Sequence, residues 1–505
     1  MKTKVHFQSI IEALNGFEEE YVDKLVQMKF KGWSDWSILK KPLFYLFKNR
    51  SYGLGRPPGA KRKSIPLSWA FKEVWYLTRL FFWILWRRKG DVIYGNTGNK
   101  LDKDKDGFYT DVFMDPLINA GLLHRYIFFE DNSETGAERP SKVKIHLYHR
   151  GRNGIVIILQ RMYVRRKDVQ ERAAWWSSKL NQFFEENDEP MRITQKEVAE
   201  IFSQFLAQYR WNKFMLQLNR PRRVFFVDGI PLGRMAAARS LGIEVHEFQH
   251  GFVSNNKADY IVAGAFRACK QHMVIPNHIY VFGDYFRDLL LKSGFWDKSE
   301  VISIGSSVVE RNRQSYQYKP AAAGEKLKVL WITQPTIFEN TKTWLNQMPM
   351  SELDGIEISL KTHPLEPSAN LEWYKEFVEK NAVHFALEAE PNLFSALRNK
   401  HVLIGFHSTA LLEAISVGVP VATVCTPQFP HGINSLLDMD ASEVMKPIES
   451  VHDLLALLAK LKSAPDHCHV WSKESYELGD YFFSEHYQRN LEKYFSKKGV
   501  NDNYH

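Results

Sequence analysis

Cysteine and long apolar runs are what this 505-residue sequence has least of. Cys269, Cys425 and Cys468 are far apart and show no CxxC spacing. This excludes a disulfide framework and a zinc site of paired cysteines, and it favours reduced thiols in a cytoplasmic protein. Met1 to Asn15 lacks the apolar stretch of a signal peptide. The aromatic run from Leu80 to Trp86 has only seven residues, whereas a membrane-spanning helix needs about 20, so we expect no spanning helix.

Acidic charge is scarce near the start of the chain. The formal net charge is +9, and the excess of Lys and Arg lies within the first hundred residues, so the remainder is close to neutral. An enzyme of nucleic acids more often spreads positive charge over its binding face, so we expect no nucleic-acid partner. A basic end suits the anionic inner face of a membrane better.

Residues 1–90 are expected to form a basic, aromatic-rich N-terminal extension. Within it, the segment Trp69–Lys89 carries four tryptophans and ends in a basic cluster. Two interpretations stay open. The segment is either a helix that lies in the membrane interface with its Trp rings at headgroup depth, or a core helix that packs on the next domain. If the segment is an interfacial helix, the protein is cytoplasmic and peripheral on the inner face of the cytoplasmic membrane.

Residues 91–318 are predicted to form a Rossmann-like domain, because strand-like and helix-like patterns alternate along them. A helical stretch is expected between Lys167 and Leu218, and a helix over Pro231–Leu241 ends at Gly242. The predicted strands are Leu122–Phe129, Val143–His149, Gly154–Leu159, Val224–Val227, Glu244–Phe248, Ile279–Phe282 and Val301–Ile304.

Residues 326–480 repeat this pattern after a linker over 319–325 rich in Pro, Ala and Gly, and 481–505 are expected to be a C-terminal helix and tail. The predicted strands are Leu327–Ile332, Ile356–Lys361, His401–Ile404 and Val419–Val424. The fold class is therefore α/β, with two Rossmann-like domains that face each other across a cleft. Ligands of such sheets bind at the carboxyl ends of the strands.

The sharpest motif follows the strand that ends at Ile404. Ser408 and Thr409 occupy a short turn that caps the next helix, and the exposed N–H groups there suit a phosphate. Glu413 lies on that helix, where a carboxylate can hold ribose hydroxyls. Gly418 and Pro420 end the helix before the next strand. The plainer interpretation is an ordinary capped helix.

A second motif is the dipeptide His363-Pro364 at the end of the strand Ile356–Lys361. An imidazole at that edge can donate a hydrogen bond to phosphate oxygens and offset charge on a departing nucleotide. A His-Pro pair by itself is usually a turn. The Ser-Thr turn about forty-five residues later strengthens the nucleotide interpretation.

The domain of residues 91–318 has its own polar strand ends. Asp228 follows one strand and His250 follows the next, and transfer of a group to a hydroxyl needs a base that accepts the hydroxyl proton. Asp228 and His250 are the candidates, with Glu247 as a weaker one. Alternatively, Asp228 caps the helix after Pro231 and His250 is a structural ring.

The pair of His363-Pro364 and Ser408-Thr409 is similar to the motifs of bacterial CMP-sugar-dependent sialyltransferases, polysialyltransferases and Kdo transferases. Asp228 resembles the end of their acidic motif, although Val227 stands where that motif has its first acid. The block from Phe248 to Gly251 is similar to capsule and O-antigen biosynthesis proteins. The resemblance covers about 220–461 and implies a GT-B-like, inverting glycosyltransferase that needs no cofactor and no metal.

The resemblance also implies residue roles. Asp228, or else His250, would activate the acceptor hydroxyl, and His363 would support the leaving phosphate. Ser408 and Thr409 would bind that phosphate, with Glu413 on the ribose. The remaining residues expected to border the nucleotide are Gln334, Pro335, Thr336, Pro364, Gly305 and Ser306.

The partners implied are a nucleotide-sugar donor, with a CMP-sugar such as sialic acid or Kdo preferred, and a growing surface polysaccharide or lipid-linked glycan as acceptor. Three alternatives stay open. The His-Pro pattern also occurs in polyol-phosphate polymerases that use CDP-glycerol. A non-catalytic subunit of a capsule assembly complex and a nucleotide-sugar epimerase are the others.

Overall fold

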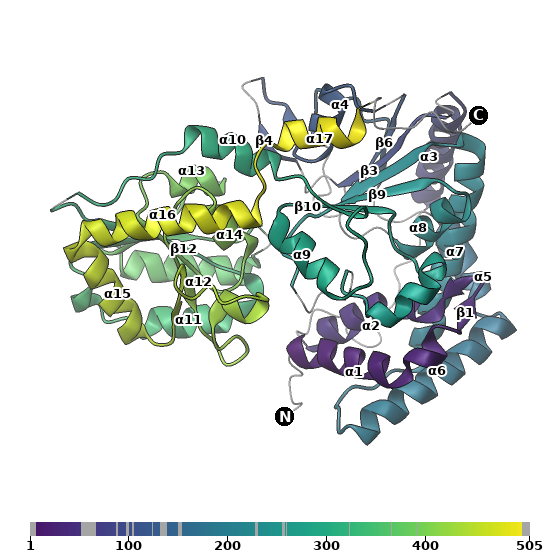
Figure 1. Cartoon of the computed structure of the whole chain (residues 1–505), viewed down its shortest axis with the longest axis horizontal. Coiled ribbons are helices and arrows are strands. Elements are labelled where there is room, and N and C mark those ends of the chain that lie inside the picture. Colours follow the sequence, from purple (N-terminus) through teal and green to yellow (C-terminus); the bar gives the residue numbers. More distant parts are fainter. Residues whose placement is uncertain are drawn as a thin grey trace.

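The computed structural model describes residues 7–51, 67–86, 89–96, 100–103, 106–123, 125–131, 139–149, 154–227, 231–254, 258, 260–322, 324–364, 366–390 and 392–496. Over these residues the chain forms two α/β halves that lie side by side along the long axis of the molecule (Figure 1). Each half is built on its own parallel sheet. The predicted α/β, GT-B-like fold class of two Rossmann-like domains is therefore confirmed.

The sheet of the first half has seven strands in the order β11-β10-β9-β8-β3-β6-β7, all paired in parallel. The chain begins in the middle at β3, fills one side, and then returns to β8 to fill the other. The strands are β3 (Val92–Asn96), β6 (Ile127–Asp131), β7 (Leu147–His149), β8 (Arg223–Val227), β9 (Glu244–Phe248), β10 (His278–Val281) and β11 (Val301–Ser303). This return creates a topological switch point between β3 and β8.

The sheet of the second half has six parallel strands in the order β14-β13-β12-β15-β16-β17. Its switch point lies between β12 and β15. The strands are β12 (Leu327–Ile332), β13 (Ile356–Lys361), β14 (Phe385–Leu387), β15 (Val402–Gly405), β16 (Val421–Val424) and β17 (Met445–Ile448). Most residues of these strands are apolar and buried, as expected of a parallel sheet covered on both faces.

The remaining described elements are mainly helices around the two sheets, with two short antiparallel pairs, β1 (Lys29–Phe30) with β2 (Trp33–Ser34) and β4 (Lys100–Lys103) with β5 (Tyr109–Asp111). The helices of the first half not introduced below are α4 (Met114–Asn119), α8 (Leu232–Ser240) and α9 (Asp284–Lys292). Those of the second half are α11 (Phe338–Asn346), α12 (Ser368–Lys380), α13 (Leu393–Leu397), α14 (Thr409–Ile415) and α15 (Val451–Ser463).

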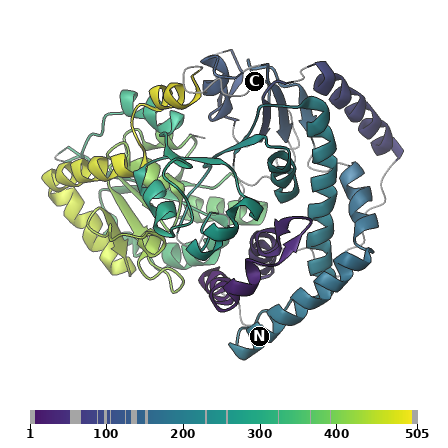
Figure 2. The same ribbon diagram turned by 45° about the vertical axis from the view of Figure 1, so that its right-hand side comes forward.

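The first two helices are built into the core of the first half. Helices α1 (Phe7–Leu25) and α2 (Asp35–Ser51) pack beside α6 (Lys167–Glu186) and α7 (Gln195–Asn219) (Figures 1 and 2). The rings of Trp36 and Trp176 stack with centroids 5.9 Å apart, and the Trp176 indole donates to Asp35 Oδ2 at 2.8 Å. Lys40 pairs with Glu18 in the same interior. Residues 7–51 therefore cannot be removed without exposing this core.

Helix α3 (Leu67–Trp86) has features of both interpretations of the aromatic segment. Leu80 and Ile84 are buried against α7 and the sheet. The opposite face carries large apolar side chains whose exposed fractions lie between 54% and 70%. These exposed residues are Val74, Trp75, Phe82, Leu85 and Trp86.

One predicted strand is wrong. Residues expected to form a strand over Gly154–Leu159 instead begin α5 (Gly154–Tyr163), which packs against α7. A short apolar run fits a buried strand or a helix equally well, and the sequence alone does not separate them. Ile158 and Met162 point away from the core, one turn apart on the exposed side of α5.

The chain crosses between the halves twice. The first crossing follows α10 (Ser307–Ser315) and runs through the linker at 319–325 into β12. The second follows α16 (Pro465–Phe482), which packs on α14 of the second half, and leads to α17 (Tyr487–Phe495). Phe495 of α17 packs against Phe225 and Tyr280 of the first sheet, so the last helix belongs to the core of the first half.

None of the helices within the described part of the chain is both long and apolar enough to cross a bilayer.

Candidate functional site

The two halves touch where the carboxyl ends of β9 and β15 face each other. The backbone N–H of Phe252, in the loop after β9, donates to Thr409 Oγ1 in the first turn of α14 at 3.1 Å. A Cβ added at the neighbouring Gly251 would lie 3.8 Å from the same oxygen. The Phe248–Gly251 block and the Ser-Thr turn, far apart in sequence, therefore meet at one place.

The turn after β15 has the predicted form. Ser408 is the N-cap of α14, and its side chain accepts from the N–H of Ala410 at 3.3 Å. This turn stands beside the switch point of the second sheet, because β15 pairs with β12. Thr409 uses its oxygen as an acceptor for the first half and keeps its hydroxyl proton to donate.

Gln334 bridges this switch point. It follows β12, and its side chain donates to the carbonyl of His407 at 2.7 Å and accepts from the N–H of His407 at 3.4 Å. The two strand ends are therefore held at a fixed separation. Pro335 begins the short 3-10 turn Pro335–Ile337, and Thr336 within it is exposed.

His363 follows β13, the strand next to β12 on the side away from β15. Its ring is half-buried, and burial lowers the pKa of His363, so the imidazole is neutral at pH 7. Its carbonyl accepts from the N–H of Glu366 at 2.9 Å, which forms a tight turn at Pro364. His363, Gln334 and Ser408 thus follow three adjacent parallel strands. Neighbouring strands of a sheet lie about 5 Å apart.

Two further groups of this edge have shifted pKa values. Burial lowers the pKa of His407 to about 4, and its Nδ1 is buried without a hydrogen-bond partner while its ring packs on Phe429 at 4.5 Å. Burial raises the pKa of Glu413 to about 7. Within the described residues, no hydrogen bond or ion pair reaches the Glu413 carboxyl. The sequence motif contained His407, but nothing in it marked this ring as buried.

On the side of the first half, His250 is exposed at the end of β9, and its ring centroid lies 6.0 Å from that of Phe113. Gln249, its neighbour, is buried: it accepts from the N–H of Phe282 at 2.9 Å and donates to the carbonyl of Gly251 at 2.9 Å. This side chain ties the ends of β9 and β10. Asp228, the residue that follows β8 in the sequence, lies outside the described residues.

Glu247 has a different environment from the one expected for a base. Its side chain is buried, the Tyr260 hydroxyl donates to it at 2.8 Å, and it lines a pocket with Glu18 and Lys40 of the N-terminal helices. It points to the face of the sheet opposite Phe248. The weaker candidate is therefore a residue of the interior.

Gly305 and Ser306 lie next to the segment in which the chain crosses back to the first half after α16. Gly305 has φ +93°, and a Cβ there would collide with the carbonyl oxygen of Ser484. Ser306 caps α10 by accepting from the N–H of Val309 at 3.4 Å. Both line a small pocket with Phe113 at the carboxyl edge of the first sheet.

No group of three or more His, Cys, Asp or Glu side chains within the described ranges is placed to hold a metal ion.

Two parallel sheets whose strand ends meet in this way define a GT-B-like protein. No protein-family model and no curated protein sequence matches the chain. Among solved structures, the chain is similar to a putative UDP-N-acetylglucosamine 2-epimerase from Listeria monocytogenes, with 11% identity, a TM-score of 0.45, and 80% of this chain and 94% of that chain covered.

Two further solved structures are similar to a comparable degree. For MurG of Acinetobacter baumannii the identity is 11% and the TM-score 0.40, with 80% of this chain and 99% of that chain covered. For the wall teichoic acid polymerase TagF the identity is 12% and the TM-score 0.43, with 84% and 95% covered. These likenesses are too distant to assign an activity, which is therefore argued from the site.

Proposed function

We propose that the protein is a glycosyltransferase that moves a sugar from a nucleotide donor, preferably a CMP-sugar, to a surface polysaccharide or a lipid-linked glycan. The observation that carries the proposal is the contact between Phe252 and Thr409. It brings the end of β9 in one half to the switch point of the other, and an enzyme that joins two substrates needs such a place.

The second half would hold the donor. Open α/β sheets bind their ligands in the crevice at the carboxyl ends of the strands beside the switch point, which here is bordered by Gln334 and Ser408. The nucleotide phosphate would lie over this edge. Because His363 is neutral at pH 7, it would act there as a hydrogen-bond donor to the leaving phosphate rather than as a cation. Glu413 would hold the ribose.

The first half would hold the acceptor. His250 is exposed beside the contact, and Asp228 follows the strand next to β9 in the sequence. Either is a suitable general base by residue type. Comparison of Asp228→Asn with His250→Ala at saturating donor separates them, because the variant of the true base loses rate and keeps nucleotide affinity.

Nucleotide binding is tested first by thermal unfolding with CMP, CDP, UDP and GDP. A ligand at about 100 times its Kd stabilises the folded state by about 2.7 kcal/mol, so we expect a rise in Tm with the cytidine nucleotides. Ser408→Ala should abolish most of this rise. A rise with CDP alone would favour a polyol-phosphate transferase, and conversion of a UDP-sugar without acceptor would identify an epimerase.

The matched control is Thr194→Ala, which removes the N-cap of α7 at the exposed capping box with Glu197. Both variants lose a helix cap, so each should lose about 1 kcal/mol of stability. Only Ser408→Ala should lose the response to nucleotide. An equal response in both variants, or none in the unaltered protein, would contradict a donor site at this turn.

His363→Ala should lower turnover about 10²-fold or more, in the range of a lost electrostatic or acid–base contribution. The measurement is sugar transfer at saturating donor, with the Tm rise on nucleotide binding recorded for the same variant. Turnover near that of the unaltered protein would remove His363 from the chemistry.

A further inference from the structure

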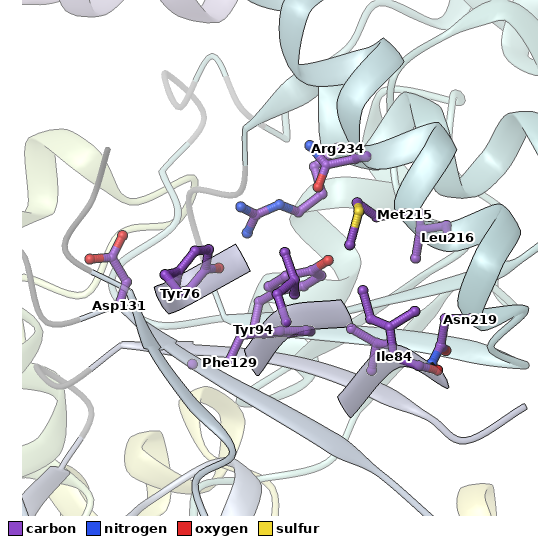
Figure 3. Close-up of a pocket in the computed structure, with 13 residues that line it drawn as sticks. Tyr76, Ile84, Tyr94, Phe129, Asp131, Met215, Leu216, Asn219 and Arg234 are labelled. Atoms are coloured by element: carbon purple, nitrogen blue, oxygen red, sulfur yellow. The ribbon is translucent and has the colours of Figure 1, made fainter. Parts of the chain in front are cut away.

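A pocket opens in the first half between the sheet and two helices (Figure 3), and all of its lining residues belong to the first half. One wall is α3, with Leu80 and Ile84, and another is α7, with Met215 and Leu216. The floor includes Phe129 of β6. Its volume is about 70 Å³, several times the ~10–15 Å³ that one water needs. Most of its walls are apolar.

One end of the pocket is polar. Arg234, in the first turn of α8, extends its guanidinium over the ring of Tyr94, with Cζ 4.0 Å from the ring centroid (Figure 3). Within the described residues, no carboxylate pairs with Arg234, and its Nε is buried without a hydrogen-bond partner. A buried donor without an acceptor costs free energy. The Arg234 Nε could therefore donate to an anionic ligand, which would share the pocket with the carboxylate of Asp131.

The polar end lies at the carboxyl edge of the first sheet. Gly95 and Asp131, which line the pocket, are at the ends of β3 and β6. His250 follows β9 in the same parallel sheet, so it lies at the same edge. A ligand with its head at Arg234 would thus present the group attached to that head toward the edge at which His250 lies.

The other side of α3 points away from the pocket and is the exposed apolar face of Trp75, Phe82 and Trp86. Two cations accompany this helix. Arg79 belongs to it and donates to the carbonyl of His146, and Lys144 of a neighbouring segment lies 4.9 Å from the ring centroid of Trp83. A helix with one apolar face outward and a pocket behind it is placed to pass an amphiphile from a lipid surface into the protein.

We propose that this pocket binds the lipid phosphate of a lipid-linked acceptor, with the phosphate on Arg234 and the first segment of the apolar chain between α3 and α7. Guanidinium suits phosphate because it offers parallel N–H donors and stays charged. The role of the lipid as an acceptor rests on the proposed glycosyltransferase activity, but the binding of the lipid to the pocket does not depend on that activity.

The test measures binding of farnesyl phosphate to the full-length protein by calorimetry, below the concentration at which the lipid forms micelles. We expect farnesyl phosphate to bind at least tenfold more tightly than farnesol, because charged hydrogen bonds to phosphate contribute that much or more. Inorganic phosphate should bind far more weakly than either. Equal affinity of farnesol and farnesyl phosphate would overturn the role of Arg234.

Two variants locate the site. Arg234→Gln should weaken farnesyl phosphate at least tenfold and leave farnesol unchanged. Leu80→Phe, which fills the apolar part, should weaken both ligands. Its matched control is Leu85→Phe on the exposed face of the same helix, which should change neither. If Arg234→Gln does not fold, the contrast between Leu80→Phe and Leu85→Phe still decides, and equal affinities there would place the lipid elsewhere.

Binding of a short-chain phosphatidic acid distinguishes a site for a lipid-linked acceptor from a site for a membrane phospholipid. Binding weaker than that of farnesyl phosphate supports an acceptor site, whereas equal or tighter binding would overturn it in favour of a site for membrane lipid. The Tm response to nucleotides is recorded alongside. If nucleotides bind and farnesyl phosphate does not, this inference alone fails. If farnesyl phosphate binds and no nucleotide does, the glycosyltransferase proposal fails and the lipid pocket stands.

Discussion

Single side chains perform the same task in both halves of the molecule. Gln249 ties the ends of β9 and β10, and Gln334 ties the ends of β12 and β15, each by using both ends of its amide. Glutamine is suited to this because it carries a donor and an acceptor on one short planar group. Substitution by Glu would keep the shape but lose the donor. These ties fix the edges on which a ligand would lie.

At the residue scale, Glu413 makes stability depend on pH. Its pKa is about 7 in the folded protein, above the ~4.3 of an unfolded chain. The folded state therefore binds the proton more tightly, and the free energy of unfolding falls as pH rises from about 4 to about 7. The difference of pKa corresponds to about 4 kcal/mol.

Glu413→Gln removes this dependence. We expect the variant to be more stable than the unaltered protein at pH 8, by up to about 4 kcal/mol, and to be similar to it at pH 4.5. Urea unfolding at the two pH values measures the difference. A difference of the same size at both would show that the carboxyl does not titrate in this range.

At the scale of elements, the strands with continuous apolar sequence were predictable. The predicted bounds of Glu244–Phe248, Leu327–Ile332 and Ile356–Lys361 are confirmed residue by residue. The apolar run at Gly154 was not, because a helix buried on one side has the same composition, and its packing against α7 decides the outcome. The apolar pattern of a segment indicates which of its residues are buried, but contacts with distant segments decide whether a short apolar run forms a strand or a helix.

The candidate site was partly predictable for the same reason. A Ser-Thr turn after a strand indicates a capped helix, and Ser408 caps α14. The contact of Thr409 with Phe252, more than 150 residues earlier in the chain, has no local signal. Nor has the amide of Gln334 on His407, since a glutamine after a strand is common.

The exposed face of helix α3 predicts that the protein binds to membranes. Its exposed apolar face and the cations beside it favour binding to an anionic lipid surface. We expect the protein to float with vesicles that contain phosphatidylserine and to be released by high salt, which screens the attraction. Replacing Trp75, Phe82 and Trp86 together by Ser should prevent flotation.

The control for that experiment replaces two exposed valines of the second half, Val383 and Val470, by Ser. It removes apolar surface of the same kind from elsewhere and should leave flotation unchanged. Flotation of the α3 variant together with the vesicles would exclude this helix as the contact. Because residues 7–51 belong to the core, point substitutions are more informative than removal of the N-terminal ninety residues.

At the scale of the whole molecule, the last helix couples the two halves. Phe495 of α17 packs between Phe225, Phe248 and Tyr280 of the first sheet, although the chain has just left the second half. Phe495→Ala should lower the free energy of unfolding by about 3–5 kcal/mol, as for other buried Phe residues. The loss should appear in the unfolding of the first half.

The measurement is urea unfolding followed by two probes, intrinsic fluorescence and far-ultraviolet circular dichroism, with Tyr494→Ala on the exposed side of the same helix as control. The control should change stability by less than about 0.5 kcal/mol. Equal losses in the two variants would show that α17 frays from the sheet in solution.

The two crossings of the chain run next to each other. Arg313 of α10, beside the first crossing, pairs with Asp480 and donates to the carbonyl of Phe483 at the end of α16, where the second crossing begins. It also donates to the carbonyl of Ser416 at the end of α14. Two adjacent covalent connections restrict sliding and twisting of one half against the other more than a single connection would. Under the proposed function, a donor on one half and an acceptor on the other would therefore meet in a constant alignment.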